Sequence, residues 1–213
     1  MKLSIIGAGN VGGALGKAWA EKAGHEVFFG VRQPDSEKTR ALLAGIRGKA
    51  QAGRPQEAAA FAGIVVLTTP WPETEGAIRA MGGLKGKIVL DCTNPLGMVD
   101  GKLGLTIGHS ISGGEKVQGW AAGASVFKTL NTTGYSNMAD TAFKAGKPVM
   151  FVAGDDAAAK PTVTALVGEL GFDMIDAGPL RNARLLEAHA MLWIDLALNH
   201  GLGRDWAFAI LRR

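Results

Sequence analysis

GAGNVG, residues 7–12, follows a short apolar run and opens a pattern typical of an amphipathic helix. In a strand–turn–helix context, Gly7 makes the tight turn and Gly9 lets the backbone approach a pyrophosphate. Gly12 then lets the helix pack close to the strand. The N-terminus of that helix, beginning near Asn10 and Val11, adds amide donors and positive potential. The stretch therefore predicts a dinucleotide-binding turn.

The rest of the chain alternates in the same way, which indicates a parallel sheet with helices on both faces. IVVLT, residues 64–68, is apolar throughout, as a strand buried on both faces should be. SGGE, residues 112–115, fits a capping box that opens a helix. The predicted strands are 2–6, 26–29, 49–52, 63–68, 87–91, 125–128, 148–153 and 172–175, and the predicted helices are 11–22, 35–43, 56–61, 73–81, 115–121 and 158–170.

Residues 180–213 differ from the rest, being helical in pattern and rich in Leu, Ala and Trp. A helix that is apolar nearly all round is usually buried against its own domain or against a second subunit. We therefore expect an α/β fold with a Rossmann-type, doubly wound and mostly parallel sheet. Residues 1–179 would form the dinucleotide-binding domain, and residues 180–213 a small C-terminal helical segment at the dimer or acceptor side.

Composition excludes several classes of protein. The 213 residues are 47% apolar and 20% charged, as in an ordinary globular domain. The net charge of +4 suits an anionic small molecule, but no Lys/Arg cluster marks a nucleic-acid groove. Cys92 is the only cysteine, so a reducing, cytoplasmic location is expected. Charged residues interrupt the apolar stretch 185–202, which excludes a membrane span. No group of His, Cys and Asp residues has the spacing of metal ligands.

The second predicted strand lacks the acid that a dinucleotide site usually carries at its end. A carboxylate there would bind the ribose hydroxyls and repel a 2′-phosphate, but the chain reads Gly30, Val31, Arg32. We expect Gly30 to leave room and Arg32 to bind a phosphate, with Pro34 opening the next helix and Lys38 adding charge. The pattern favours NADP(H) over NAD(H), the alternative for Arg32 being a solvated surface side chain.

Other strand ends supply further candidates, because ligands of doubly wound sheets lie beyond the carboxyl ends of the strands. TTPW, residues 68–71, would border the nicotinamide half, with Pro70 fixing the backbone and Trp71 walling the ring or packing in the core. Asn94 is a candidate donor to the ribose or carboxamide, or a turn residue before Pro95.

KTLN, residues 128–131, ends another predicted strand. Lys128 and Asn131 are similar to the catalytic pair of β-hydroxyacid dehydrogenases, in which the lysine is the acid/base. The alternative is a polar pair at the sheet edge with no catalytic role. Those dehydrogenases usually carry a helical substrate domain far larger than residues 180–213, which is an argument against this alternative.

Taken together, the chain resembles the NADPH:deazaflavin (coenzyme F420-dependent NADP) oxidoreductase family. The resemblance rests on IIGAGNVGGALG (5–16), the VR pair (31–32), VVLTTPW (65–71), IDAGPLRNARLLE (175–187) and the end HGLGRDWAFAILRR (200–213). KTLNTTGY, residues 128–135, looks more like a bacterial branch than the archaeal enzymes. The domain also looks like the cytosolic part of ferric reductases, in which NADPH reduces a flavin.

The resemblance implies a homodimer that passes hydride between NADPH and a small-molecule redox acceptor, which could be coenzyme F420, FMN or FAD. By resemblance, the residues lining NADP would be Gly7, Gly9, Asn10, Val11, Gly12, Arg32, Thr69, Pro70 and Trp71. Direct ring-to-ring transfer needs no side-chain acid or base. The alternatives are a dehydrogenase that uses Lys128 as acid/base and a non-catalytic NADPH sensor.

Overall fold

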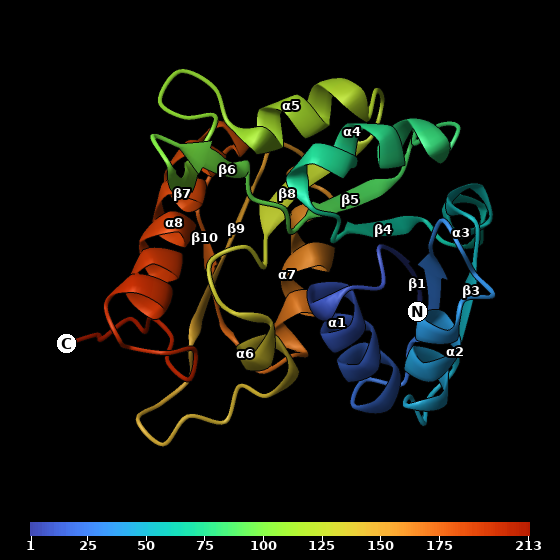
Figure 1. Ribbon diagram of the computed structural model, residues 1–213, viewed down its shortest axis with the longest axis horizontal. Helices are drawn as coiled ribbons and strands as arrows, with labels where there is room; N and C mark the ends of the chain where they lie inside the picture. The colour runs from blue at the N-terminus through green and yellow to red at the C-terminus, as the bar shows by residue number, and fades with distance from the viewer.

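An eight-stranded sheet forms the centre of the molecule (Figure 1), in a computed structural model that describes residues 1–213. The strand order is β10-β9-β8-β5-β4-β1-β2-β3, and all neighbours are parallel except β8 and β9. The strands are β1 (Lys2–Ile6), β2 (Glu26–Gly30), β3 (Ala50–Gly53), β4 (Ile64–Leu67), β5 (Ile88–Asp91), β8 (Ser125–Thr129), β9 (Val149–Gly154) and β10 (Asp173–Asp176). The order β3-β2-β1-β4-β5-β8 is that of a Rossmann fold. The predicted fold class is confirmed.

Two hydrophobic cores lie on opposite faces of this sheet, because side chains alternate along each strand. On β1, Leu3 and Ile5 belong to one core and Ile6 to the other. The first core includes α1 (Asn10–Glu21), α2 (Glu37–Ala44), α6 (Tyr135–Ala139) and α7 (Lys160–Gly168), and the second α3 (Pro55–Phe61), α4 (Trp71–Ala80) and α5 (Gly113–Trp120). In Figure 1, α4 and α5 lie above the sheet, and α1, α6 and α7 lie below it.

All eight predicted strands and all six predicted helices occur, with ends that shift by a few residues. The capping box at Ser112 is also present: its hydroxyl accepts a hydrogen bond from the Glu115 amide, and the Glu115 carboxylate accepts one from the Ser112 amide. The sequence reasoning missed helix α6 and a two-stranded hairpin of β6 (Leu96–Val99) and β7 (Lys102–Leu105). The four-residue strands of this hairpin each carry one glycine, Gly97 and Gly104, so their apolar pattern is weak.

The prediction of a helical C-terminus is only half right. After the short turn Leu180–Asn182, helix α8 (Ala183–Asn199) ends where Gly201 and Gly203 take positive φ angles of 75° and 67°. Residues 200–213 are not helical; they lie as an irregular strap over α8 and β9. The Trp206 carbonyl accepts hydrogen bonds from Asn137 and Trp193, and the Phe208 carbonyl accepts one from the Val149 amide.

Helix α8 stands beside the β6–β7 hairpin at the end of the sheet opposite β3 (Figure 1). None of the helices has both the length and the apolar character needed to cross a membrane.

Candidate active site

A cleft with a volume of about 1170 Å³ opens between β1 and β4, where the strand order reverses. This is the position at which doubly wound sheets bind ligands. The volume exceeds the roughly 300–1,000 Å³ of ordinary small-molecule pockets, so a dinucleotide is a suitable occupant. Ten of the predicted cofactor residues line the cleft: Gly7, Gly9, Asn10, Val11, Arg32, Lys38, Thr69, Pro70, Trp71 and Asn94.

The glycine turn forms the floor of the cleft, and its backbone fits a phosphate-binding role. Gly7 has a φ of 106°, which side chains rarely tolerate, and a Cβ at Gly9 would meet nothing within 4 Å, so its backbone is open to a ligand. Gly12 lies behind the turn and does not line the cleft. A Cβ at this position would collide with the Gly7 carbonyl, so the close packing of helix and turn requires a glycine. The Thr68 hydroxyl secures the turn by donating to the Ile6 or Gly7 carbonyl, 3.0 and 3.1 Å away.

At the β2 end of the cleft, Arg32 is exposed and paired with Glu73, the third residue of α4, at 3.1 Å. The two side chains have exposed fractions of 84% and 52%, so a ligand phosphate can compete for Arg32. Lys38 is also exposed and lines the same end. This region presents cations where a 2′-phosphate would lie.

Two details of the phosphate prediction are wrong. Pro34 does not open the next helix, because α2 begins at Glu37 and is capped by the Ser36 hydroxyl, which accepts from the Thr39 amide. Gly30 does not simply leave room for a phosphate, since a Cβ there would point into the core against Ile6 and Ala58. The loop after Gly30, residues 31–33, lines the cleft at this end.

Around the β4 and β5 ends, the cleft wall is mostly uncharged. Trp71 lines the cleft and also packs against Trp120 in a tilted arrangement, with ring centroids 5.4 Å apart, so both expected roles of Trp71 meet in one side chain. The Thr69 hydroxyl is bonded to Thr74 at 2.9 Å. Asn94 donates to the Asn131 carbonyl and accepts from its side-chain amide, both at 3.0 Å. These bonds fix the Asn94 amide at the edge of the cleft.

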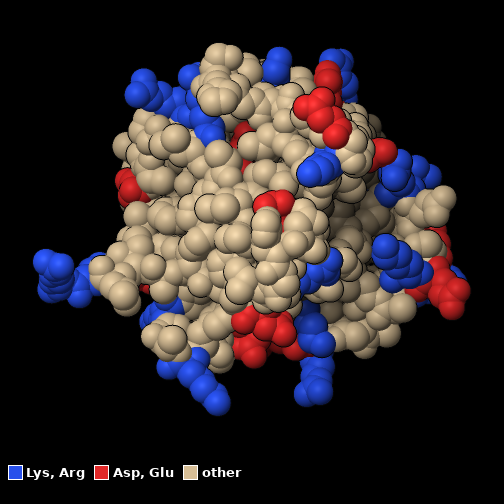
Figure 2. Space-filling model, turned by 60° about the vertical axis from the view of Figure 1, so that its left-hand side comes forward, with Lys and Arg blue, Asp and Glu red and all other residues tan.

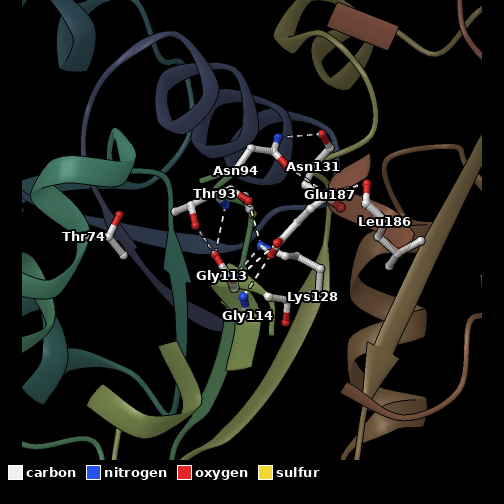
Figure 3. Close-up of polar contacts among 12 residues, drawn as sticks. Thr74, Thr93, Asn94, Gly113, Gly114, Lys128, Asn131, Leu186 and Glu187 are labelled. Atoms are coloured by element: carbon white, nitrogen blue, oxygen red, sulfur yellow. Dashed lines mark hydrogen bonds and ion pairs between the residues drawn. The ribbon is translucent and has the colours of Figure 1, made fainter. Parts of the chain in front are cut away.

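Lys128 does not line the cleft; it lies below its β5 wall with no exposed side-chain surface. Its ammonium contacts Asp91 at 2.8 Å, Glu187 at 2.9 Å and the Thr93 carbonyl at 2.7 Å, which uses all three of its protons (Figure 3). Burial alone would lower the pKa of Lys128, but the Asp91 and Glu187 carboxylates outweigh burial and raise it. Lys128 is therefore held as a cation and sealed from the cleft, which favours a structural role over acid/base catalysis.

Asn131, the other residue considered for catalysis, is also buried outside the cleft. Its side-chain amide donates to Asn94 and, at 3.2 Å, to the Leu186 carbonyl of α8. Leu130, just before it, has a φ of 57°, unusual for a branched side chain, so this loop holds a strained backbone. Asn131 reaches the cleft only through Asn94.

The sequence reasoning gave no role to Glu187, although it lies in the quoted stretch 175–187. Glu187 is buried, and its carboxylate accepts hydrogen bonds from the Gly113 and Gly114 amides at the N-terminus of α5. An acid that directly follows two leucines in a largely apolar helix was the available signal. Thr68, Thr93 and Glu73 were given no individual role either, although Thr68 lies within TTPW, Thr93 directly precedes Asn94, and Glu73 follows Trp71 by two positions.

Comparison with known proteins agrees with the dinucleotide-binding character of this cleft. Residues 2–95 match a family described as NADP oxidoreductase, coenzyme F420-dependent. Over the full length of both chains, the protein is 34% identical to one from Arthrobacter sp. FB24 that is assigned as an F420-dependent NADP reductase, with a TM-score of 0.91.

More distant structures share the fold. A reductive aminase from Aspergillus terreus, in complex with NADPH4, is 20% identical with a TM-score of 0.67, over 94% of this chain and 62% of the other. A pyrroline carboxylate reductase from Plasmodium falciparum, with NADP bound, is 11% identical with a TM-score of 0.54, over 97% and 71%.

Fold, cleft and comparisons together define an NADP-dependent oxidoreductase. Within that class, the chain belongs to the coenzyme F420-dependent NADP oxidoreductase family.

Proposed function

We propose that this chain transfers hydride between NADP(H) and the ring of a deazaflavin or flavin. One observation carries the proposal: the wall at the β4 and β5 ends holds no side chain that could exchange a proton near neutral pH. The residues there are Thr69, Pro70, Trp71, Cys92, Thr93, Asn94 and Leu96. Burial, together with the neighbouring Asp91 carboxylate, raises the pKa of the Cys92 thiol far above its ordinary range. Such a site suits a reaction that moves hydride without an acid or base.

In the proposed reaction, the reduced nicotinamide supplies the hydride and the acceptor ring takes it up, with any accompanying proton coming from water. The protein binds the phosphates at the glycine turn, holds the 2′-phosphate at Arg32 and Lys38, and aligns the rings beside Trp71 and Asn94. Alignment and exclusion of water are then its contributions to the rate.

The test is NADPH oxidation followed by stopped flow, with coenzyme F420, FMN, FAD and ferric chelate offered separately and NADH as the control donor. We expect saturable oxidation of NADPH with the deazaflavin or with a flavin, and much slower oxidation of NADH. Turnover with ferric chelate alone would contradict the proposed acceptor class. Tight binding of NADPH without any turnover would instead support the sensor alternative.

We also propose that the protein works as a homodimer that meets its partner through α8 and the β6–β7 hairpin. Leu185, Leu192 and Leu198 on α8 are 67%, 51% and 52% exposed, and Met98 on the hairpin is 69% exposed. The side of the molecule that carries α8 and the hairpin shows few charged residues near its middle (Figure 2). Exposed apolar side chains such as Leu185 and Leu192, which share one face of α8, are a common sign of an interface.

Light scattering on a gel-filtration column measures the mass of the assembly. We expect twice the chain mass for the wild-type protein and the mass of a single chain for Leu192→Glu, because a buried unpaired charge opposes association. Glu75→Gln, on the far side of the cleft in α4, is the control and should leave the mass unchanged. A wild-type chain that elutes as a monomer at micromolar concentration would contradict the dimer.

A further inference from the structure

We propose that Glu187, Lys128 and Asn131 are positioning residues: Glu187 and Lys128 hold Thr93, Asn131 holds Asn94, and together they set the place of the nicotinamide at the β5 wall of the cleft. This inference rests on the proposed NADP(H) site. It assigns to α8 and to the buried lysine a role in cofactor alignment rather than in proton transfer.

Thr93 is held at three points by buried charges. Its carbonyl accepts a hydrogen bond from Lys128 at 2.7 Å. Its amide and hydroxyl both donate to Asp91 Oδ1, at 2.9 and 2.7 Å, while Asp91 Oδ2 is bonded to Lys128. The backbone of Thr93, which lines the cleft, therefore moves only if the Asp91–Lys128 pair moves with it.

Helix α8 fixes this network from outside the sheet (Figure 3). Glu187 Oε1 lies 2.9 Å from Lys128 Nζ, and the two Glu187 oxygens accept from the Gly113 and Gly114 amides at 2.8 and 2.9 Å. The partial positive charge of the α5 N-terminus offsets the second carboxylate around the single lysine. Glu187 thus locks β8, α5 and α8 together at one point.

Small residues make this close approach possible. A Cβ on Gly113 would come within 3.0 Å of Glu187 Oε1, and one on Gly114 would come within 3.0 Å of the Ala183 Cβ. The close packing of α8 on α5 therefore explains the two glycines of SGGE, which the capping box alone does not.

Asn94 is tied to the same turn of α8 by a second route. Asn131 exchanges two hydrogen bonds with Asn94 and donates a third to the carbonyl of Leu186, the residue before Glu187. Adjacent residues of one helix thus hold adjacent residues of the cleft wall, Leu186 through Asn131 to Asn94 and Glu187 through Lys128 to Thr93. The adenosine half has separate anchors at the glycine turn and Arg32.

The test compares two ligands, NADPH and 2′,5′-ADP, which share the 2′-phosphate and adenosine but not the nicotinamide. We expect Glu187→Gln to weaken NADPH about tenfold and to leave the affinity for 2′,5′-ADP within about twofold. Asn131→Ala, which does not alter the buried charges, should act in the same direction and keeps the test valid if Glu187→Gln fails to fold. Isothermal titration measures both affinities.

Glu115→Gln is the matched control. Glu115 also joins α5 to α8, through Arg184 at 2.6 Å, but makes no contact with the wall of the cleft. The hydrogen bonds from Arg184, followed by those from Ser112, lower the pKa of Glu115 to about 2, so this link is present at neutral pH. Glu115→Gln should lose stability and keep both affinities.

Equal losses for NADPH and 2′,5′-ADP would overturn the proposal, since they would indicate a general loosening. Unchanged NADPH affinity in both Glu187→Gln and Asn131→Ala, or the Glu187→Gln pattern appearing in Glu115→Gln, would overturn it as well. Failure of the proposed site itself is distinguishable, because the wild-type chain would then bind NADPH no better than a dinucleotide without the 2′-phosphate.

Discussion

Lys128→Met is expected to lower the free energy of unfolding by about 3–5 kcal/mol. The lysine, Asp91 and Glu187 are all at most 1% exposed, so the variant would leave two carboxylates buried without their cation. Because small domains are stable by only about 5–15 kcal/mol, this loss would be a large part of the total. Urea unfolding followed by circular dichroism measures it.

Lys160→Met is the control for the loss of a lysine. Lys160 is 16% exposed and contacts Asp176, which is 59% exposed, and the Gly178 carbonyl. Solvent screens such a pair, so the expected cost is about 1 kcal/mol or less. A loss for Lys128→Met no larger than that for Lys160→Met would contradict the importance of the buried cluster.

A double variant separates charge from packing. Adding Glu187→Gln to Lys128→Met removes one of the two uncompensated charges, so the double variant should be at least as stable as Lys128→Met alone. Strictly additive losses would mean that the two residues are not coupled.

Turnover by the folded fraction of Lys128→Met tests the acid/base alternative. General acid–base catalysis contributes about 10²–10⁴ to a rate and gives it a pH dependence. Because Lys128 is sealed from the cleft, we expect the rate of hydride transfer to depend on pH as in the wild-type protein, even if the maximal rate changes. A profile altered by the substitution would restore the dehydrogenase hypothesis.

The sequence was sufficient for the fold and for most of the cleft. Both follow from local patterns: the glycine turn must lie between a strand and a helix, and parallel strands bring their carboxyl ends to one edge. Arg32, Thr69, Trp71 and Asn94 could therefore be placed at one cleft without any knowledge of long-range contacts.

The role of Lys128 could not be predicted in the same way. Its three partners are Asp91, Thr93 and Glu187, which stand 35 to 59 positions away in the sequence, and only the folded chain brings them together. The strand pattern placed Lys128 correctly at the end of β8, but it did not tell whether the ammonium faces the cleft or the interior. The contact with Glu187 of α8 helps to hold the ammonium in the interior, and a helix that carries apolar residues nearly all round does not reveal that partner from its sequence pattern.

Arg32→Ala is expected to weaken NADPH by about ten- to a hundredfold and NADH by no more than about twofold. The estimate follows from the roughly 1.5–3 kcal/mol that a hydrogen bond to a charged group contributes. Fluorescence titration of the two reduced cofactors measures the ratio. Arg40→Ala, an exposed arginine of α2 that does not line the cleft, is the control for charge alone and should change both affinities little. Equal losses for NADPH and NADH in Arg32→Ala would contradict the 2′-phosphate assignment.

Glu73 makes the prediction sharper, because it is paired with Arg32 and brings a negative charge to the phosphate end of the cleft. The exposed Arg32–Glu73 pair is worth at most about 1 kcal/mol, so Glu73→Gln should tighten NADPH by about two- to fivefold. If Glu73 acts by competing for Arg32, that gain should disappear when Arg32 is already Ala. If it acts by repelling the phosphate directly, the gain should persist in the double variant. In either case, weaker NADPH binding by Glu73→Gln would mean that the pair helps to build the phosphate site instead of competing with it.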